Sequence, residues 1–70
     1  MMDLIVTDPE IMSGTPCFRG TRVPVSVLFD NLADGMTIDE IIQEWPSLNK
    51  DDVIAVLGWT SDEISRIAAA

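Results

Sequence analysis

Residues 14–24 read GTPCFRGTRVP, and they mark the point where an extended chain gives way to helices. The two prolines bias the residues before them toward an extended backbone. Gly20 can adopt the positive φ of a tight turn, so we expect a tight turn or small hairpin centred on residues 19–21. Upstream, residues 4–6 (LIV) are a β-prone run. The segment 1–23 is therefore predicted to hold two or three short strands.

Downstream of this stretch, apolar residues recur at helical spacing and predict three helices. The first begins at Pro24, a residue suited to a first helical turn, and ends at Gly35. The second begins after Thr37, which forms a capping box with Glu40, and ends before Pro46. The predicted apolar faces consist of Val25, Leu28, Phe29 and Leu32 in the first helix and Ile38, Ile41, Ile42 and Trp45 in the second.

The third helix is predicted to begin after Asn49, whose side chain suits an N-cap. Spacings of four and three run through positions 53, 57, 60, 64 and 67, which favours one long helix. Gly58, followed by TSDE at residues 60–63, offers the alternative of a stop and a new capping box. Trp59 lies outside the apolar register and suits either the edge of the core or a subunit interface.

The predicted fold is mainly α, in a single domain over residues 1–70. An extended or β segment (1–23) precedes a three-helix bundle (24–70) that resembles a helix-turn-helix. A chain of 70 residues buries only about 60% of its unfolded surface, yet 47% of these residues are hydrophobic. We therefore expect a homodimer, formed by pairing of residues 4–6 across chains and by exposed apolar helix surface.

The composition argues against metal sites and catalysis. A lone Cys17 and the absence of histidine exclude an internal disulfide and a structural zinc site, and we expect no cofactor and no metal. A Ser-His pair and a phosphate-binding loop are also missing, so we expect no enzyme. Cys17 is expected to be a buried structural residue rather than a thiolate activated by Arg19. The apolar runs are too short to span a membrane, and the lone cysteine suits the cytoplasm.

The net charge of −8 opposes general nucleic-acid binding, but half of the four basic residues lie in the opening stretch. Arg19 and Arg22 have two interpretations: they pair with the chain's own carboxylates, or they face phosphate or acidic groups on a partner. We expect Arg19, at the tip of the turn, to face outward and leave Arg22 undecided. The candidate internal partners are Asp8, Glu10 and Asp30, and the candidate DNA- or partner-binding residues are Arg19, Thr21, Arg22 and Lys50.

Several motifs extend over residues 8–57: DPEI, G-x-P-x-x-R-G-T-R-V-P-V, L-A-x-G-x-T-x-D-E-I, P-x-L and D-D-V. With these motifs the chain resembles the domain-of-unknown-function family 433. That resemblance implies a homeodomain-like helix-turn-helix preceded by a small β element. It also implies a VapB-type antitoxin, encoded beside a PIN-like ribonuclease toxin, that neutralises the toxin and regulates its own gene by binding DNA.

Two functional hypotheses follow. The first is an antitoxin that binds a PIN-like ribonuclease and operator DNA; the alternative is a dimeric protein-interaction module without DNA binding. Thr15 stands where the resembled family usually has a basic residue, and the third helix begins with Lys50 followed by two aspartates. Both features weaken DNA binding, which should be weak and salt-sensitive, and they leave toxin binding less affected.

Overall fold

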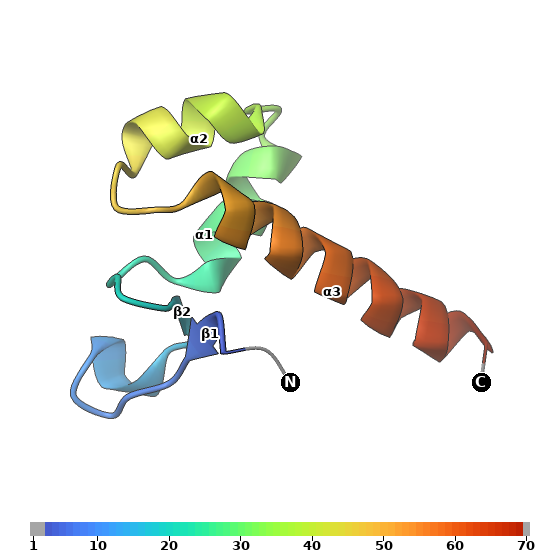
Figure 1. The fold of residues 1–70 in the computed structure, drawn as a ribbon, viewed down its shortest axis with the longest axis horizontal. Coiled ribbons are helices and arrows are strands. Elements are labelled where there is room, and N and C mark those ends of the chain that lie inside the picture. Colours follow the sequence, from blue (N-terminus) through green and yellow to red (C-terminus); the bar gives the residue numbers. More distant parts are fainter. Residues whose placement is uncertain (1–2, 70) are drawn as a thin grey trace.

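A small antiparallel sheet forms the N-terminal part of the computed structural model, which describes residues 3–69 (Figure 1). Strand β1 (Ile5–Val6) pairs with β2 (Cys17–Phe18), with Ile5 opposite Phe18 and Val6 opposite Cys17. The backbone N–H of Arg19 extends this pairing by donating to the carbonyl of Leu4 at 2.8 Å. β1 thus pairs along one edge within its own chain, and the pairing predicted between residues 4–6 of two chains stays a prediction.

The other side of β2 is held by the residues that follow the turn. The N–H of Phe18 donates to the carbonyl of Val23 at 3.0 Å, and Cys17 forms an isolated bridge with Pro24. Between them, the N–H of Thr21 donates to the carbonyl of Phe18 at 3.1 Å and closes a tight turn. Gly20 has a φ of 73°, the positive value that the third position of a type II turn requires. The predicted small hairpin is thus confirmed.

The first helix, α1 (Val25–Ala33), starts one residue later than predicted because Pro24 serves as its N-cap. With a ψ of 140° Pro24 is still extended, so it ends the hairpin as well as opening the helix. Gly35 stops the helix as predicted, with a φ of 91°. The N–H of Met36 then donates back to the carbonyl of Asn31 at 3.0 Å, which satisfies one of the carbonyls left free at a helix end.

The second helix, α2 (Ile38–Glu44), opens with the predicted capping box. The N–H of Glu40 donates to Thr37 Oγ1 at 3.2 Å, and the N–H of Thr37 donates to Glu40 Oε1 at 2.9 Å. Hydrogen bonds to the Glu40 carboxylate, first from the backbone N–H of Thr37 and then from the Thr37 side chain, lower the pKa of Glu40. The carboxylate therefore supports the start of α2 at neutral pH, and this support is lost as the pH falls through the lowered pKa.

The third helix, α3 (Lys50–Ala69), is continuous over 20 residues. Asn49 caps it, since its Oδ1 accepts the N–H of Asp51 at 2.8 Å and that of Asp52 at 3.2 Å. The helix passes through Gly58 without a break, so the single-helix prediction is confirmed and the alternative of a new capping box at residues 60–63 is wrong. Among residues 3–69, no helix is both long and apolar enough to cross a membrane.

The core lies where β2, the turn and the three helices meet, and α2 packs against both α1 and α3. The predicted apolar faces of α1 and α2 are directed into it, with Leu28 and Ile41 fully buried. Trp45, at the end of α2, packs against the core as predicted. The buried cluster consists of Phe18, Val23, Leu28, Ile41, Leu48, Val53 and Val56.

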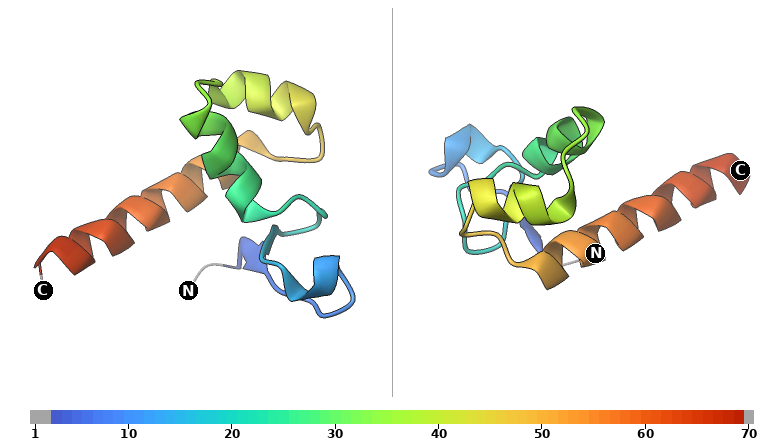
Figure 2. Two further views of the ribbon diagram at one scale, coloured as in Figure 1. Left: turned by 180° about the vertical axis from the view of Figure 1, so that it is seen from behind. Right: turned by 90° about the horizontal axis from the view of Figure 1, so that it is seen from above.

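Only the first half of α3 takes part in this core. Val53 and Val56 are fully buried, whereas Ile64 and Ile67, on the same predicted apolar face, are 61% and 75% exposed. Figures 1 and 2 show the reason: the second half of α3 extends away from the other elements in every view. The positions of the apolar residues on α3 were predicted correctly. Those near its C-terminal end stay exposed, because no other element packs against them there.

Glycine-to-alanine substitutions at Gly20 and Gly58 test the backbone conformation at these two positions. At neither position would an added Cβ come within 4 Å of another part of the structure, so a steric clash does not complicate the result. Gly20→Ala should lower the free energy of unfolding by about 1–2 kcal/mol, the cost of a left-handed backbone for a residue with a side chain. Gly58→Ala, inside α3, should raise it by about 0.5–1 kcal/mol. Urea unfolding at one protein concentration measures both. A loss of stability in Gly58→Ala would contradict the continuous helix.

Candidate binding site

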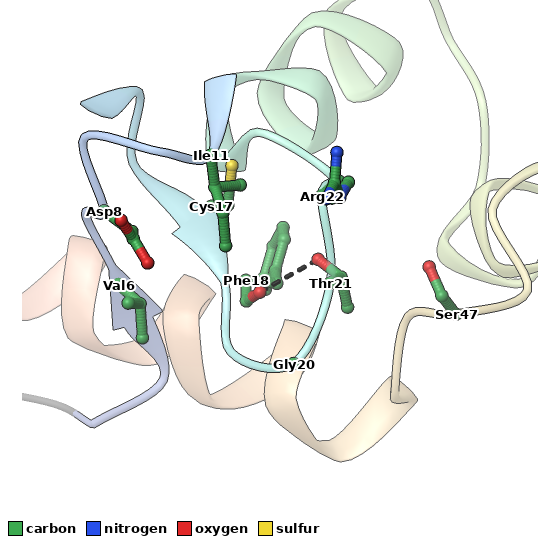
Figure 3. Close-up of a pocket in the computed structure, with 9 residues that line it drawn as sticks. All are labelled: Val6, Asp8, Ile11, Cys17, Phe18, Gly20, Thr21, Arg22 and Ser47. Atoms are coloured by element: carbon green, nitrogen blue, oxygen red, sulfur yellow. Dashed lines mark hydrogen bonds between the residues drawn. The ribbon is translucent and has the colours of Figure 1, made fainter. Parts of the chain in front are cut away.

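A hollow of about 390 Å³ lies beside the small sheet and the hairpin turn (Figure 3). Its volume is within the range of about 300–1,000 Å³ that is typical of ligand-binding pockets. The β segment, the turn and the connection between α2 and α3 all contribute to it. The lining residues are Val6, Asp8, Ile11, Cys17, Phe18, Gly20, Thr21, Arg22 and Ser47.

The centre of the hollow is apolar and its edges are polar. In Figure 3, Ile11, Cys17 and Phe18 lie between Asp8 on one side and Arg22 on the other. Asp8 is engaged locally, because one carboxylate oxygen accepts the N–H of Glu10 at 2.9 Å. Its carbonyl also accepts the N–H of Ile11 at 2.9 Å, which turns the chain back toward the sheet. This turn places Ile11 at the hollow.

Thr21 is one of the residues predicted to bind DNA or a partner, and in the structure its hydroxyl makes two hydrogen bonds within the hairpin turn. Oγ1 donates to the carbonyl of Phe18 at 2.9 Å and accepts the N–H of Val23 at 3.0 Å. Both bonds lie across the base of the hairpin turn. The Thr21 side chain therefore braces the turn on which the neighbouring Arg22 stands.

Arg19 stands on the same turn, and its guanidinium lies 3.6 Å from the carboxylate of Asp52 at the start of α3. The two side chains are 54% and 22% exposed, so water weakens this ion pair. The internal partner is none of the three carboxylates that we predicted. Arg19 is exposed, as we predicted. The contact of its guanidinium with Asp52 on α3 was not predicted.

Lys50 lies at the start of α3 and does not line the hollow. Its Nζ is 2.7 Å from Asp39 Oδ1, which is at the start of α2. Arg66 pairs with Glu63 one turn away at 3.1 Å. Within residues 3–69, Arg22 is thus the one basic side chain with no carboxylate inside 4.0 Å.

The structure therefore brings Thr21 and Arg22 to one site and leaves Arg19 and Lys50 in ion pairs. Sequence analysis missed the apolar lining, namely Val6 and Ile11, and it missed Ser47. Val6 could have been found from strand alternation, which points successive side chains to opposite faces. Ser47 is 25 residues from Arg22 along the chain, and no local pattern signals that they line one hollow.

Comparison with known proteins identifies the family of the chain. Residues 5–60 match the family described as "Protein of unknown function (DUF433)". The chain belongs to the DUF433 family. The uncharacterized protein y4eO of Sinorhizobium fredii is 35% identical over 51 residues, which are 73% of this chain and 23% of that much longer protein. The chain thus spans about a quarter of that relative's length.

The fold is also found in an experimental structure. The crystal structure of a DUF433 member from Anabaena variabilis, at 2.00 Å resolution, aligns with 97% of this chain and 67% of its own. The TM-score is 0.72 and the sequence identity is 24%. This level of identity supports a shared fold. The description of the family and the names of the two relatives assign no partner or activity.

Thr21→Val tests the structural role of the Thr21 hydroxyl. The change keeps the shape of the side chain but removes the acceptor for the N–H of Val23 and the donor to Phe18. We expect the free energy of unfolding to fall by about 1–3 kcal/mol. Thr15→Val is the matched control, because that exposed hydroxyl makes one bond, to the carbonyl of Met12. Equal effects of the two changes in urea unfolding would contradict the proposed brace.

Proposed function

We propose that this DUF433 protein is a non-enzymatic antitoxin of a type II toxin–antitoxin pair, which binds a PIN-like ribonuclease through Arg22 and the adjoining hollow. It acts as a homodimer in the cytoplasm, where a lone thiol such as that of Cys17 stays reduced. The observation that carries the proposal is the isolation of Arg22. In a chain of net charge −8, this exposed guanidinium has no internal carboxylate partner within residues 3–69.

The chemistry of the hollow supports an acidic protein partner. A guanidinium binds a carboxylate through two parallel hydrogen bonds, and it keeps its charge at every physiological pH. The apolar centre beside it offers contact to an aliphatic or aromatic side chain next to that carboxylate. PIN-like ribonuclease sites are built around acidic residues, so an inserted arginine would both bind the toxin and occupy its active site.

A binding role also suits the polar groups of the site better than catalysis does. The hydroxyl of Thr21 already donates one hydrogen bond and accepts another, and Asp8 accepts the N–H of Glu10. Cys17 is buried as we predicted, with 3% of its surface exposed. A nucleophile must be accessible to its substrate, and this thiol is not.

The test compares Arg22→Ala with Arg66→Ala. Arg66 serves as the matched control because it is an exposed arginine with a partner, Glu63, on α3. The probe is a purified PIN-like ribonuclease, which the proposal expects to be encoded in the reading frame beside this gene, and calorimetry measures the affinity. We expect Arg22→Ala to weaken binding about 30-fold, equivalent to about 2 kcal/mol, and to relieve inhibition of the ribonuclease.

We expect Arg22→Lys to recover only part of the affinity, because an ammonium group lacks the paired donors of a guanidinium. Arg66→Ala should change the affinity less than threefold. The proposal fails if the wild-type chain leaves the ribonuclease fully active at saturating concentration. Equal weakening by the two alanine substitutions would also contradict it, since that would indicate a general effect of charge.

DNA is a weaker second partner in this proposal. Lys50 and Arg19 are in ion pairs, and Asp51 and Asp52 at the start of α3 repel phosphate. One free arginine per chain gives a dimer two, so the slope of log affinity against log salt should be about −1.8. Fluorescence anisotropy with the duplex upstream of the gene measures this slope. If Lys50 and Arg19 also contacted phosphate, the dimer would make six contacts and the slope would be about −5.4, so a slope near that value would contradict their assignment to internal pairs.

A further inference from the structure

The hollow carries a negative charge on the side opposite Arg22. Asp8, half-buried, lines it from the loop that follows β1. In Figure 3 the apolar side chains at the centre of the hollow lie between Asp8 and Arg22. The site is therefore bipolar, with a carboxylate at one end, an apolar centre and a guanidinium at the other end. Binding of an acidic group by Arg22 leaves Asp8 without a role.

The carboxylate of Asp8 keeps its charge available for a partner. Within residues 3–69, no basic side chain lies inside 4.0 Å of it, and this includes Arg22 across the hollow. Its oxygen Oδ1 accepts the N–H of Glu10 at 2.9 Å. This hydrogen bond fixes the direction of the carboxylate but brings no neutralising charge. Asp8 thus resembles Arg22 in lining the hollow as a charged group without an ion-pair partner.

The loop that carries Asp8 has a fixed shape. The N–H of Ile11 donates to the carbonyl of Asp8 at 2.9 Å, and the N–H of Gly14 donates to the carbonyl of Ile11 at 3.1 Å. Between these bonds Met12 and Ser13 have φ values of 52° and 56°, which are unfavourable for residues with a side chain. Such strain persists only where the surrounding structure enforces it, and it is common in ligand-binding loops. This wall of the hollow is therefore already ordered before a partner arrives.

The charge of the chain is the reason to expect a cation on the partner. At a net charge of −8 the chain repels a purely acidic surface, even one that carries a carboxylate for Arg22. A bound protein would also cover Asp8, and a covered carboxylate without a cationic neighbour loses its hydration with nothing in return. A basic side chain beside the acidic one on the partner removes both penalties.

We propose that Asp8 is the second charged contact of this site and binds a lysine or arginine side chain of the ribonuclease. The inference rests on the proposed function, because it concerns the same partner and the same hollow. The bound segment then presents a base to Asp8, an apolar side chain to the centre and an acid to Arg22. Opposite charges at the two ends fix the direction of this segment, since a reversed segment would place like charges together.

The affinity of Asp8→Asn for the purified PIN-like ribonuclease, measured by calorimetry at low salt, tests this role. The amide oxygen of asparagine can still accept the N–H of Glu10, so the substitution removes the charge and retains the loop. We expect binding to weaken about fivefold, equivalent to about 1 kcal/mol. The difference from wild type should shrink as salt is added, because a half-buried ion pair is screened.

Two controls each remove one negative charge from residues that do not line the hollow. Glu10→Gln changes an exposed residue on the same loop, and Asp62→Asn changes an exposed residue on the second half of α3, which extends away from the sheet (Figure 1). Each should change the affinity less than twofold. Circular dichroism and urea unfolding of the three variants verify that the fold is retained.

Double-mutant cycles locate the partner of Asp8. Each basic residue of the ribonuclease is replaced by alanine, and one of these changes should abolish the effect of Asp8→Asn. Within this chain, Asp8→Asn and Arg22→Ala should act independently, because they contact different groups of the partner. Together they should weaken binding about 150-fold, the product of the two separate effects.

The outcomes separate this inference from the function on which it rests. A ribonuclease that does not bind the wild-type chain would overturn both. If the wild type binds, Arg22→Ala weakens binding and Asp8→Asn does not, the antitoxin function stands and the role of Asp8 is overturned. Tighter binding by Asp8→Asn would also overturn it, since Asp8 would then compete with the partner for Arg22. Equal weakening by either control would reduce the result to a general effect of charge and overturn the role of Asp8.

Discussion

Phe18 is the residue through which the two parts of this fold are joined. Its backbone lies between β1 on one side and Val23 on the other, while its side chain is 2% exposed within the helical core. A two-stranded sheet is marginal in water unless it packs against other elements. Burial of Phe18 provides that packing. The Thr21 hydroxyl and the positive φ of Gly20 then fix the turn, so the position of Arg22 follows from the same constraint.

The basic side chains near this turn differ in whether they are paired with a carboxylate. Arg19 connects it to α3 through Asp52, and Lys50 connects α3 to α2 through Asp39. Both pairs are exposed, so each contributes little to stability, about 0–1 kcal/mol. Their larger effect is to neutralise the basic side chains on which a helix-turn-helix would rely to attract phosphate. Arg22 keeps its charge available at the edge of a hollow with an apolar centre, and this combination is the basis on which we propose a protein partner rather than a nucleic acid.

Local patterns in the sequence were enough to predict the elements. The Thr37 capping box, the Asn49 cap, the stop at Gly35 and the turn at Gly20 depend on residues within a few positions of one another, and all four are present. The site depends on contacts across the chain. The distance between Arg19 and Asp52 in sequence, like that between Arg22 and Ser47, is closed only by the packing of the helices. For this reason the charged partners and the apolar lining were not predicted.

The length of α3 explains why its apolar face extends beyond the core. A helix of 20 residues is about 30 Å long, close to the longest dimension of the whole domain, 35 Å. The two other helices, of nine and seven residues, are too short to cover it. In proteins, helices gain most of their stability from tertiary packing rather than from intrinsic propensity. Leu28, Ile41 and Phe18 supply this packing at the beginning of α3, where Val53 and Val56 are buried, whereas Ile64 and Ile67 at its end stay mostly exposed.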